Sequence, residues 1–257
     1  MDAATNPPPA TESAPPEPMS LIDRLTGVIT SPGEVFDDVK ASPVRNSNWA
    51  LPFILVCLAG IFYTCMAFSQ QAVVTAMQDQ REQAIQKQVA AGKIPQAQAD
   101  QAITMTRNMM TPTVMKVTGG IFALIGSAGS LFLMALCVWG GVKMLAETQV
   151  GFMKITEVCG LALVIDVLQK IIRAWLVMWK ENILSTVSPT LLLANPDMTN
   201  RRDIFLSMID PIDVWWLVVM SLGVSKVSGL SKGKSAALCF GIWFGFRIIM
   251  AFLTPAK

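Results

Sequence analysis

Long apolar stretches without a charged residue constrain this chain more than any other feature. Residues 49–68 contain no Asp, Glu, Lys or Arg, and about twenty helical residues at 1.5 Å each cross the roughly 30 Å of hydrocarbon in a bilayer. A helix satisfies its backbone N–H and C=O groups within one segment, as hydrocarbon demands. Of all residues, 53% are apolar and only 15% are charged, far from the soluble average. An all-α membrane protein is therefore predicted.

The apolar stretches predict a bundle of five transmembrane helices. The expected spans are residues 49–68, 117–142, 155–178, 214–227 and 235–253. Span three is the least regular, because four charged residues interrupt it. Pro52 is expected in the first turn of span one, where its missing N–H does no harm. Asp210 and Asp213 precede span four, and we interpret them as a helix N-cap and a first-turn acid rather than as a catalytic carboxylate pair.

Two segments precede the first span. Residues 1–19 contain six prolines and almost no large apolar side chain, so they predict a disordered tail. Residues 20–48 predict two short amphipathic helices on the membrane surface. The second of these is expected to start with a capping box formed by Ser31 and Glu34, with Pro32 at the first helical position.

A polar segment and a basic loop set the expected topology. Residues 69–116 are rich in Gln and Ala, and a break at residues 92–95 predicts a helical hairpin outside the bilayer, between spans one and two. Lys226, Lys232 and Lys234 crowd a short loop that lacks acidic residues, which the positive-inside rule places in the cytoplasm. The amino terminus is then cytoplasmic, and the hairpin lies on the opposite side of the membrane.

The residue types present exclude the common forms of catalysis and metal binding. The chain contains no histidine, which removes the commonest general base and metal ligand. Its five cysteines fall in apolar stretches without a C-x-x-C pair, and no glycine-rich phosphate loop or nucleophile elbow is present. A net charge of +2 with scattered basic residues gives no field that would attract nucleic acid. We therefore expect no catalytic, cofactor or metal site, no enzyme activity and no nucleic-acid partner.

Charged residues within the expected spans are the candidate functional residues, since charge is costly inside a bilayer. They are Glu157, Asp166, Lys170, Arg173 and Arg247. At 100° per residue the middle three share one helix face, and Asp166 and Lys170 are spaced to pair. Two interpretations stay open. Either a proton or ion relay runs from Glu157 through Asp166 with Arg247 as counter-charge, or Asp166 and Lys170 form an internal ion pair whose basic end reaches the interface.

Small residues at four-residue spacing mark faces on two spans. Gly119, Ala123 and Ser127 fall on one face of span two, and Gly241 and Gly245 fall on one face of span five. Small side chains let helix backbones approach each other closely. We expect both faces to pack within the chain; for span five, contact with a second copy, and hence a homo-oligomer, is the alternative.

The order of several short motifs resembles the Yip1-domain family, specifically its bacterial branch. A Ser-Pro-x-x-x-Phe element at residues 31–36 precedes span one, residues 49–52 open that span, residues 208–215 lead into span four, and residues 235–237 open span five. The resemblance covers about residues 20–253. It implies a multi-pass protein of the bacterial cytoplasmic membrane, and it provides no catalytic residue to transfer.

Eukaryotic members of this family interact with small Rab-type GTPases and carry an Asp-Leu-Tyr-Gly-Pro element before the first span. That element is absent here, and the only tyrosine, Tyr63, lies within span one, so the resemblance does not imply Rab binding. The first functional hypothesis is a non-enzymatic scaffold or adaptor that contacts membrane lipid and other membrane proteins. The alternative is a small transporter or channel that uses Asp166, Lys170 and Arg247.

Overall fold

The computed structural model describes residues 18–146, 149–193, 200–207 and 209–253, and every regular element in these ranges is helical. In chain order the elements are α1 (Leu21–Thr30), α2 (Pro32–Ala41), α3 (Ser47–Ala67), α4 (Gln71–Ala90), α5 (Gln96–Met109), α6 (Pro112–Leu145), α7 (Phe152–Lys180), the 3-10 helix η1 (Pro189–Leu192), α8 (Arg201–Ser207), α9 (Pro211–Ser228) and α10 (Lys232–Leu253). The prediction of an all-α protein is confirmed for the described residues. The predicted disordered tail lies outside them, except for its last two residues.

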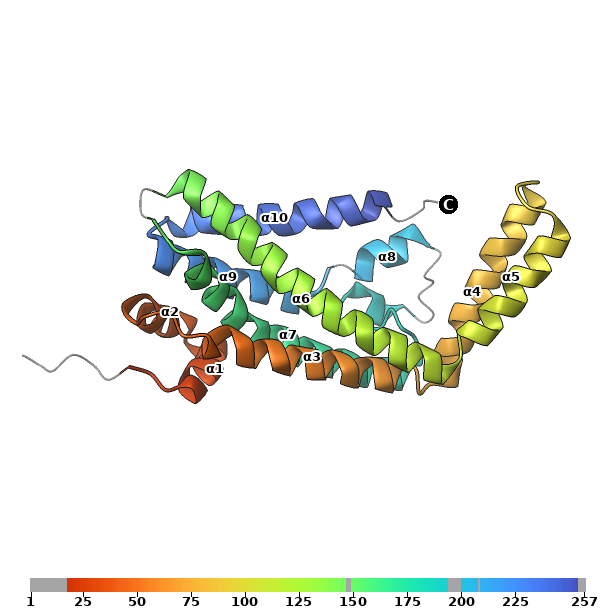
Figure 1. The fold of residues 1–257 in the computed structure, drawn as a ribbon, viewed down its shortest axis with the longest axis horizontal. Coiled ribbons are helices and arrows are strands. Elements are labelled where there is room, and N and C mark those ends of the chain that lie inside the picture. Colours follow the sequence, from red (N-terminus) through yellow and green to blue (C-terminus); the bar gives the residue numbers. More distant parts are fainter. Residues whose placement is uncertain (1–17, 147–148, 194–199, 208, 254–257) are drawn as a thin grey trace, which may run out of the picture.

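Five long helices, α3, α6, α7, α9 and α10, form the body of the molecule, with α6 crossing the others obliquely (Figure 1). α7 is central, since it packs against α3, α6 and α9, while α10 packs mainly on α9 and α6. Side chains of α7 fill the core: Ile155, Leu161 and Ile165 are fully buried. The charged residues of α7 are thereby placed among neighbouring helices.

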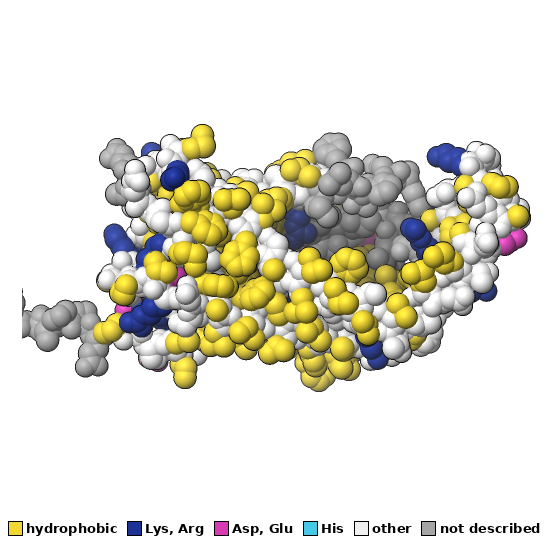
Figure 2. Space-filling view, in the orientation of Figure 1, with side chains coloured by type: hydrophobic (Ala, Val, Ile, Leu, Met, Phe, Trp, Pro, Cys, Tyr) yellow, Lys and Arg dark blue, Asp and Glu magenta, His cyan; other side chains and the backbone are white. Residues whose placement is uncertain are grey.

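Two of these helices, α3 and α6, are long and apolar enough to cross a membrane by length and composition. α6 leaves much of its apolar surface uncovered, with Ile121, Phe122 and Ile125 at least half exposed, and apolar side chains are spread along this face of the bundle (Figure 2). Charged residues interrupt α7 and α10, and α9 has one near each end. Of the five predicted spans, length and composition therefore support two.

Several helices extend beyond the apolar stretches that predict them. α3 begins at Ser47 rather than at Trp49, so Pro52 lies in the second turn and not in the first as predicted. α6 begins at Pro112, where the Thr111 side chain accepts a hydrogen bond from a backbone N–H of the first turn. Capping groups and backbone hydrogen bonds set helix ends, whereas apolar composition marks only the part that is buried or faces lipid.

α1 and α2 pack on one end of the bundle, against α7 and α9. Ser31 joins them, as the C-cap of α1 and the N-cap of α2. Its N–H bonds the Gly27 carbonyl at 2.7 Å, and its side chain makes no capping hydrogen bond. The predicted capping box is therefore wrong, because the single shared residue takes its conformation from the end of α1. A Cβ on Gly27 would lie 2.7 Å from Val35 Cγ2, so glycine at this position lets the two helices approach closely.

α4 and α5 form an antiparallel hairpin that projects from the opposite end of the bundle (Figure 1). They lie on either side of the break expected at residues 92–95. Gly92 in the turn has a φ of 67°, which glycine adopts more readily than other residues. Arg107 Nε and Nη2 donate to the two carboxylate oxygens of Glu82 at 2.6 and 2.8 Å, and these hydrogen bonds lower the pKa of Glu82.

Candidate functional site

The five charged residues proposed from the sequence do not form one cluster. Asp166 and Lys170 line a cavity between helices, and Arg247 pairs with Asp213 in the wall of that cavity. Glu157 lies at the end of the bundle that carries α1 and α2, and Arg173 lies against an aromatic ring. Nine residues at about 100° each place Glu157 and Asp166 on opposite faces of α7. These two carboxylates therefore do not share a site.

The cavity lies between α3, α6, α7, α9 and α10 and has a volume of about 240 Å³. Its polar lining comprises Ser127 and Ser130 from α6, Asp166, Gln169 and Lys170 from α7, and Asp213 from α9. No group of three or more His, Cys, Asp or Glu side chains that could hold a metal ion occurs in the described part of the chain. The cavity is thus a polar site within a largely apolar bundle.

Asp166 and Lys170 form an ion pair one helical turn apart. Lys170 Nζ lies 2.7 Å from each carboxylate oxygen of Asp166, and each side chain is 26% exposed. This is the i, i+4 pair expected from the sequence spacing. Neither charge is therefore left without a partner among the packed helices.

A second ion pair joins α9 to α10. Arg247 Nη2 donates to Asp213 Oδ2 at 2.7 Å, and the Arg247 guanidinium lies 4.8 Å from the centroid of the Trp243 ring. Arg247 is therefore the counter-charge of Asp213, whereas the relay interpretation, one of the two left open, made it the counter-charge of the carboxylates of α7. The reason is that α10 packs mainly on α9 and α6 rather than on α7.

Gln169 connects the cavity to the start of α9. Its Nε2 donates to Asp210 Oδ2 at 3.0 Å and to Asp213 Oδ1 at 2.9 Å. The other oxygen of Asp210 accepts a hydrogen bond from the Ile212 N–H at 2.8 Å, so the predicted N-cap is confirmed. Asp213 has a larger role than that of a first-turn acid. The sequence reasoning missed Gln169 and the partners of Asp213; an amide side chain beside Lys170 in an apolar helix was the available signal for Gln169.

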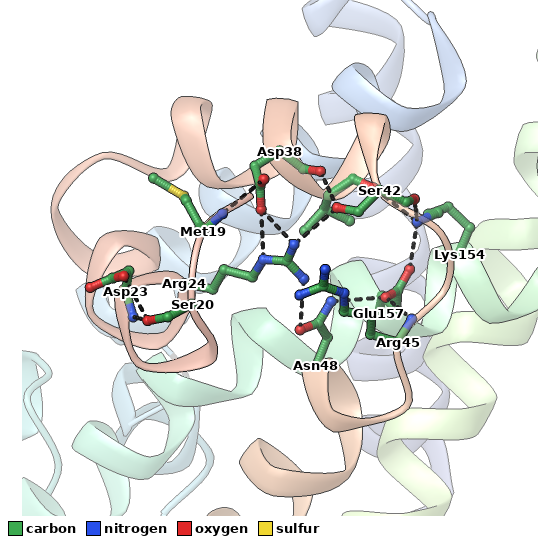
Figure 3. Close-up of polar contacts among 11 residues, drawn as sticks. Met19, Ser20, Asp23, Arg24, Asp38, Ser42, Arg45, Asn48, Lys154 and Glu157 are labelled. Atoms are coloured by element: carbon green, nitrogen blue, oxygen red, sulfur yellow. Dashed lines mark hydrogen bonds and ion pairs between the residues drawn. The ribbon is translucent and has the colours of Figure 1, made fainter. Parts of the chain in front are cut away.

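A second polar cluster ties α1 and α2 to α3 and α7 (Figure 3). Glu157 in this cluster is fully buried. One of its oxygens accepts hydrogen bonds from the Arg45 backbone N–H at 2.6 Å and from Asn48 Nδ2 at 2.8 Å. The other oxygen lies 2.8 Å from Lys154 Nζ, which also donates to two backbone carbonyls at the end of α2, each at 2.9 Å. Glu157 thus holds the end of α2 and the start of α3 against α7.

Arg24 lies in the same cluster and is only 1% exposed (Figure 3). Its Nε donates to Asp38 Oδ2 at 2.6 Å. Its Nη1 donates to Asn48 Oδ1 at 3.1 Å, and its Nη2 donates to Ser42 Oγ at 2.9 Å. All three nitrogens of the guanidinium therefore have an acceptor, and these acceptors lie on or beside α2 and α3.

The charges of this cluster balance. Two cations, Arg24 and Lys154, pair with two carboxylates, Asp38 and Glu157. Buried ions are tolerated when they are paired and hydrogen-bonded. The sequence reasoning missed Arg24, although this residue interrupts the apolar face of α1 three positions after Leu21. A charged residue on an otherwise buried helix face was the available signal.

Arg173 belongs neither to the lining of the cavity nor to the cluster around Arg24 and Glu157. Its guanidinium lies 5.3 Å from the centroid of the Tyr63 ring on α3. Its Nε is buried and has no acceptor among the described residues. The aromatic ring provides the favourable contact for this cation.

The small-residue face of α6 lies partly against α3. A Cβ on Gly119 would lie 3.2 Å from Thr64 Cγ2, and a Cβ on Gly60 would lie 3.1 Å from the Cβ of Ala123. Ser127, the third residue of this face, lines the cavity instead. The face thus combines a close helix crossing with one wall of the cavity.

Gly241 and Gly245 on α10 lack such a contact. An added Cβ on either glycine would meet no described atom within 4 Å. Within the described residues, this face therefore does not provide the close intramolecular crossing expected for it. Contact with a second copy of the chain stays as the alternative.

Comparison with known proteins adds a family to this geometry. The Yip1 domain matches residues 26–254, a range that includes every helix lining the cavity. No curated protein and no solved structure matches the chain. The resemblance inferred from the order of the short motifs is confirmed at the level of the family. The chain belongs to the Yip1-domain family.

Proposed function

We propose that the chain is a non-enzymatic scaffold or adaptor for other membrane components, and that it crosses the bacterial cytoplasmic membrane five times with its amino terminus in the cytoplasm. Membership of the Yip1-domain family supports a membrane location. The exposed apolar side chains of α3 and α6 support direct contact with lipid. The observation that carries the adaptor role is the α4–α5 hairpin, which projects from the bundle.

The proposal of five spans treats all five long helices as one bundle that crosses the membrane. α7 has 29 residues and α10 has 22, enough at 1.5 Å per residue to cross the hydrocarbon. Charged residues weaken the apolar pattern of α7, α9 and α10. Four of them form two pairs inside the bundle, Asp166–Lys170 and Asp213–Arg247, and charges within membrane spans are typically paired. Basic side chains gather at the end that bears α1 and α2 (Figure 2), which supports a cytoplasmic location for that end.

The hairpin has the properties of an arm that presents a surface. Its root is fixed to the bundle by an apolar cluster that includes Val73, Val74 and Val177, whereas α4 and α5 otherwise pack mainly on each other. Met105 and Met109 of α5 are 61% and 56% exposed. Methionine side chains are flexible and polarisable, so they adapt to the surface of a partner. A fixed root and a projecting, partly apolar arm suit an element that recruits another component.

Site-specific photocrosslinking in intact cells tests the adaptor role. A photoreactive amino acid at Met105 or Met109 samples the arm, and the same residue at Ile54 of α3, which is 52% exposed, samples the apolar surface of the bundle as a control. We expect the two arm positions to capture the same discrete protein and Ile54 to capture none. Replacement of residues 71–109 by a short glycine–serine linker should abolish co-purification of that protein. Persistent co-purification, or no discrete product from the arm, would overturn the proposal.

The cavity favours a second function, that of a small transporter or channel. Asp166 and Lys170 line it, and Arg247 pairs with Asp213 in its wall. Charged side chains within a bilayer are typical of ion and proton pathways. Proton flux into proteoliposomes, measured with a pH-sensitive dye, tests this function. We expect Asp166→Asn to abolish the flux and Asp100→Asn, in the exposed hairpin, to leave it unchanged; equal flux in both variants would contradict a transport role for Asp166.

A further inference from the structure

The cavity presents charges of both signs to a partly open space between the helices. Asp166 and Lys170 each expose 26% of the side chain and line this cavity together with Asp213. A lone cation that approached Asp166 would meet the Lys170 ammonium 2.7 Å away, and a lone anion that approached Lys170 would meet the Asp166 carboxylate, so each would be repelled by one member of the pair. A ligand that itself carries one positive and one negative group can contact both members of the pair at once.

Hydrogen-bonding capacity at the cavity is not exhausted by the ion pairs. The Lys170 ammonium has three protons and directs its bonds to a single carboxylate, whose oxygens can each accept a further bond. Trp216, which lines the cavity, has a buried indole N–H without an acceptor among the described residues. A buried donor without a partner costs free energy. An acceptor supplied by a ligand would remove that cost.

The size of the cavity limits what can enter it. A volume of about 240 Å³ is smaller than the roughly 300–1,000 Å³ of pockets that hold drug-sized ligands. Nucleotides and oligosaccharides are therefore too large. A solute of about the size of an amino acid, or the headgroup of a phospholipid whose tails remain outside, fits the space.

We propose that this cavity binds a small zwitterion, in which a short linker joins an ammonium to a carboxylate or a phosphate. The ammonium pairs with Asp166, and the anionic group accepts hydrogen bonds from Lys170 and Trp216. A free amino-acid-like solute and an ethanolamine phospholipid headgroup share this chemistry. The inference concerns binding alone, so it depends neither on the adaptor role of the hairpin nor on transport.

Binding to the purified full-length chain tests the inference. Radiolabelled glycine and phosphoethanolamine are the free zwitterionic probes, and ethanolamine and methyl phosphate serve as competitors that carry charge of one sign only. Nanodiscs that contain phosphatidylethanolamine, compared with nanodiscs of phosphatidylglycerol alone, test the headgroup as the source. Native mass spectrometry then identifies the lipid that the chain retains. We expect saturable binding of the zwitterion from at least one source, without competition by ethanolamine or methyl phosphate.

A matched pair of variants locates the binding site. Asp166→Asn combined with Lys170→Gln removes both charges but keeps two polar side chains at i, i+4, so neither member of the pair is left as an unpaired charge. Asp100→Asn combined with Lys87→Gln makes the same change on the exposed hairpin. We expect at least about tenfold weaker binding in the cavity variant and unchanged binding in the control. Trp216→Phe keeps a ring and removes only the N–H donor, so it should also weaken binding. It provides a second test if the cavity variant fails to fold.

Three results would overturn the inference. The first is failure of every zwitterionic probe, free or in lipid, to bind. The second is competition by ethanolamine or methyl phosphate as strong as that of the zwitterion, since a site for one charge would explain it. The third is binding that survives in both the cavity variant and Trp216→Phe. Retention of phosphatidylethanolamine without binding of a free solute would identify a headgroup, and the reverse a soluble ligand; each supports the proposal.

Discussion

Arg24 joins α1 to α2 and α3, because its three nitrogens donate to Asp38, Ser42 and Asn48. At 1% exposure the guanidinium has almost no contact with solvent, so water cannot replace these acceptors. Removal of one partner of a buried ion pair leaves the other without compensation, which costs more than the pair contributes when it is intact. Arg24 is therefore a position at which truncation should be severely destabilising.

Arg24→Ala should lower the free energy of unfolding by about 3–5 kcal/mol. Asp38 would lose a charge-assisted hydrogen bond, and Asn48 and Ser42 would lose their donors. Denaturant-induced unfolding in detergent micelles, followed by circular dichroism, measures the change. Arg81→Ala truncates an exposed arginine of α4 and should stay within about 0.5 kcal/mol of the unchanged chain. Equal losses in the two variants would contradict the role assigned to Arg24.

At this scale the sequence located charges but not all of their partners. A spacing of four residues in one helix is enough to pair Asp166 with Lys170. The partner of Arg247, in contrast, depends on the contact of α10 with α9. The partners of Glu157 depend on the contact of α7 with the segment between α2 and α3. Contacts between helices arise from packing, which the spacing within one helix does not specify.

At the scale of helices, the contact between α3 and α7 depends on Gly160. A Cβ on this residue would lie 2.4 Å from both the Cα and the Cβ of Trp49, so a side chain fits only if the backbone of α3 moves. The same close approach holds Asn48 of α3 and Glu157 of α7 within 2.8 Å of each other. Gly160 therefore couples helix packing to the polar cluster.

Gly160→Ala should destabilise the chain by about 1–3 kcal/mol through overpacking, even though alanine is favoured over glycine in a helix interior by about 0.8–1.0 kcal/mol. Gly126→Ala on α6 is the matched control, because its added Cβ would meet no described atom within 4 Å. We expect this control to be neutral or slightly stabilising. Thermal unfolding in detergent compares the two variants. Equal stability would be incompatible with the close approach of α3 and α7.

Apolar composition and glycine or proline breaks predicted helices in the described parts of the chain, because both signals are local. Helix ends were less predictable. α6 starts at Pro112 because Thr111 caps it, and a capping residue is not marked by hydropathy. Ser31 lacks the predicted capping bond because α1 and α2 share it. The face formed by Gly241 and Gly245 could not be assigned from its spacing, since small residues suit contacts within one chain or between two.

At the scale of the whole molecule, the number of spans decides where both ion pairs lie. α3 and α6 qualify as spans on their own composition, whereas α7, α9 and α10 rely on charges that pair between and within them. Five spans with a cytoplasmic amino terminus place the hairpin turn and the segment after α7 outside. They place the α6–α7 connection and the α9–α10 turn inside. Each of these four places has, in it or directly beside it, an exposed residue that can carry a probe: Ala91, Leu192, Gly151 and Gly233.

Single cysteines in a version without the five native cysteines test this arrangement. We expect Ala91→Cys and Leu192→Cys to react with a membrane-impermeant maleimide added to intact spheroplasts. Gly151→Cys and Gly233→Cys should react only after permeabilisation, which should expose all four and thereby shows that each probe is reactive. Reaction of Gly233→Cys from outside would remove α7 or α9 from the spans.

Protection of Leu192→Cys in intact spheroplasts, with Gly151→Cys and Gly233→Cys also protected, would instead remove both α7 and α9 from the spans. The Asp166–Lys170 pair would then lie outside the hydrocarbon, where a solvent-accessible ion pair contributes at most about 1 kcal/mol. Water could also hydrate the cavity, so its charges would no longer favour a zwitterion over water. The expected labelling pattern places the same charges in the bilayer, where little water is available to hydrate them. A ligand that carries both charges then has its largest advantage over water.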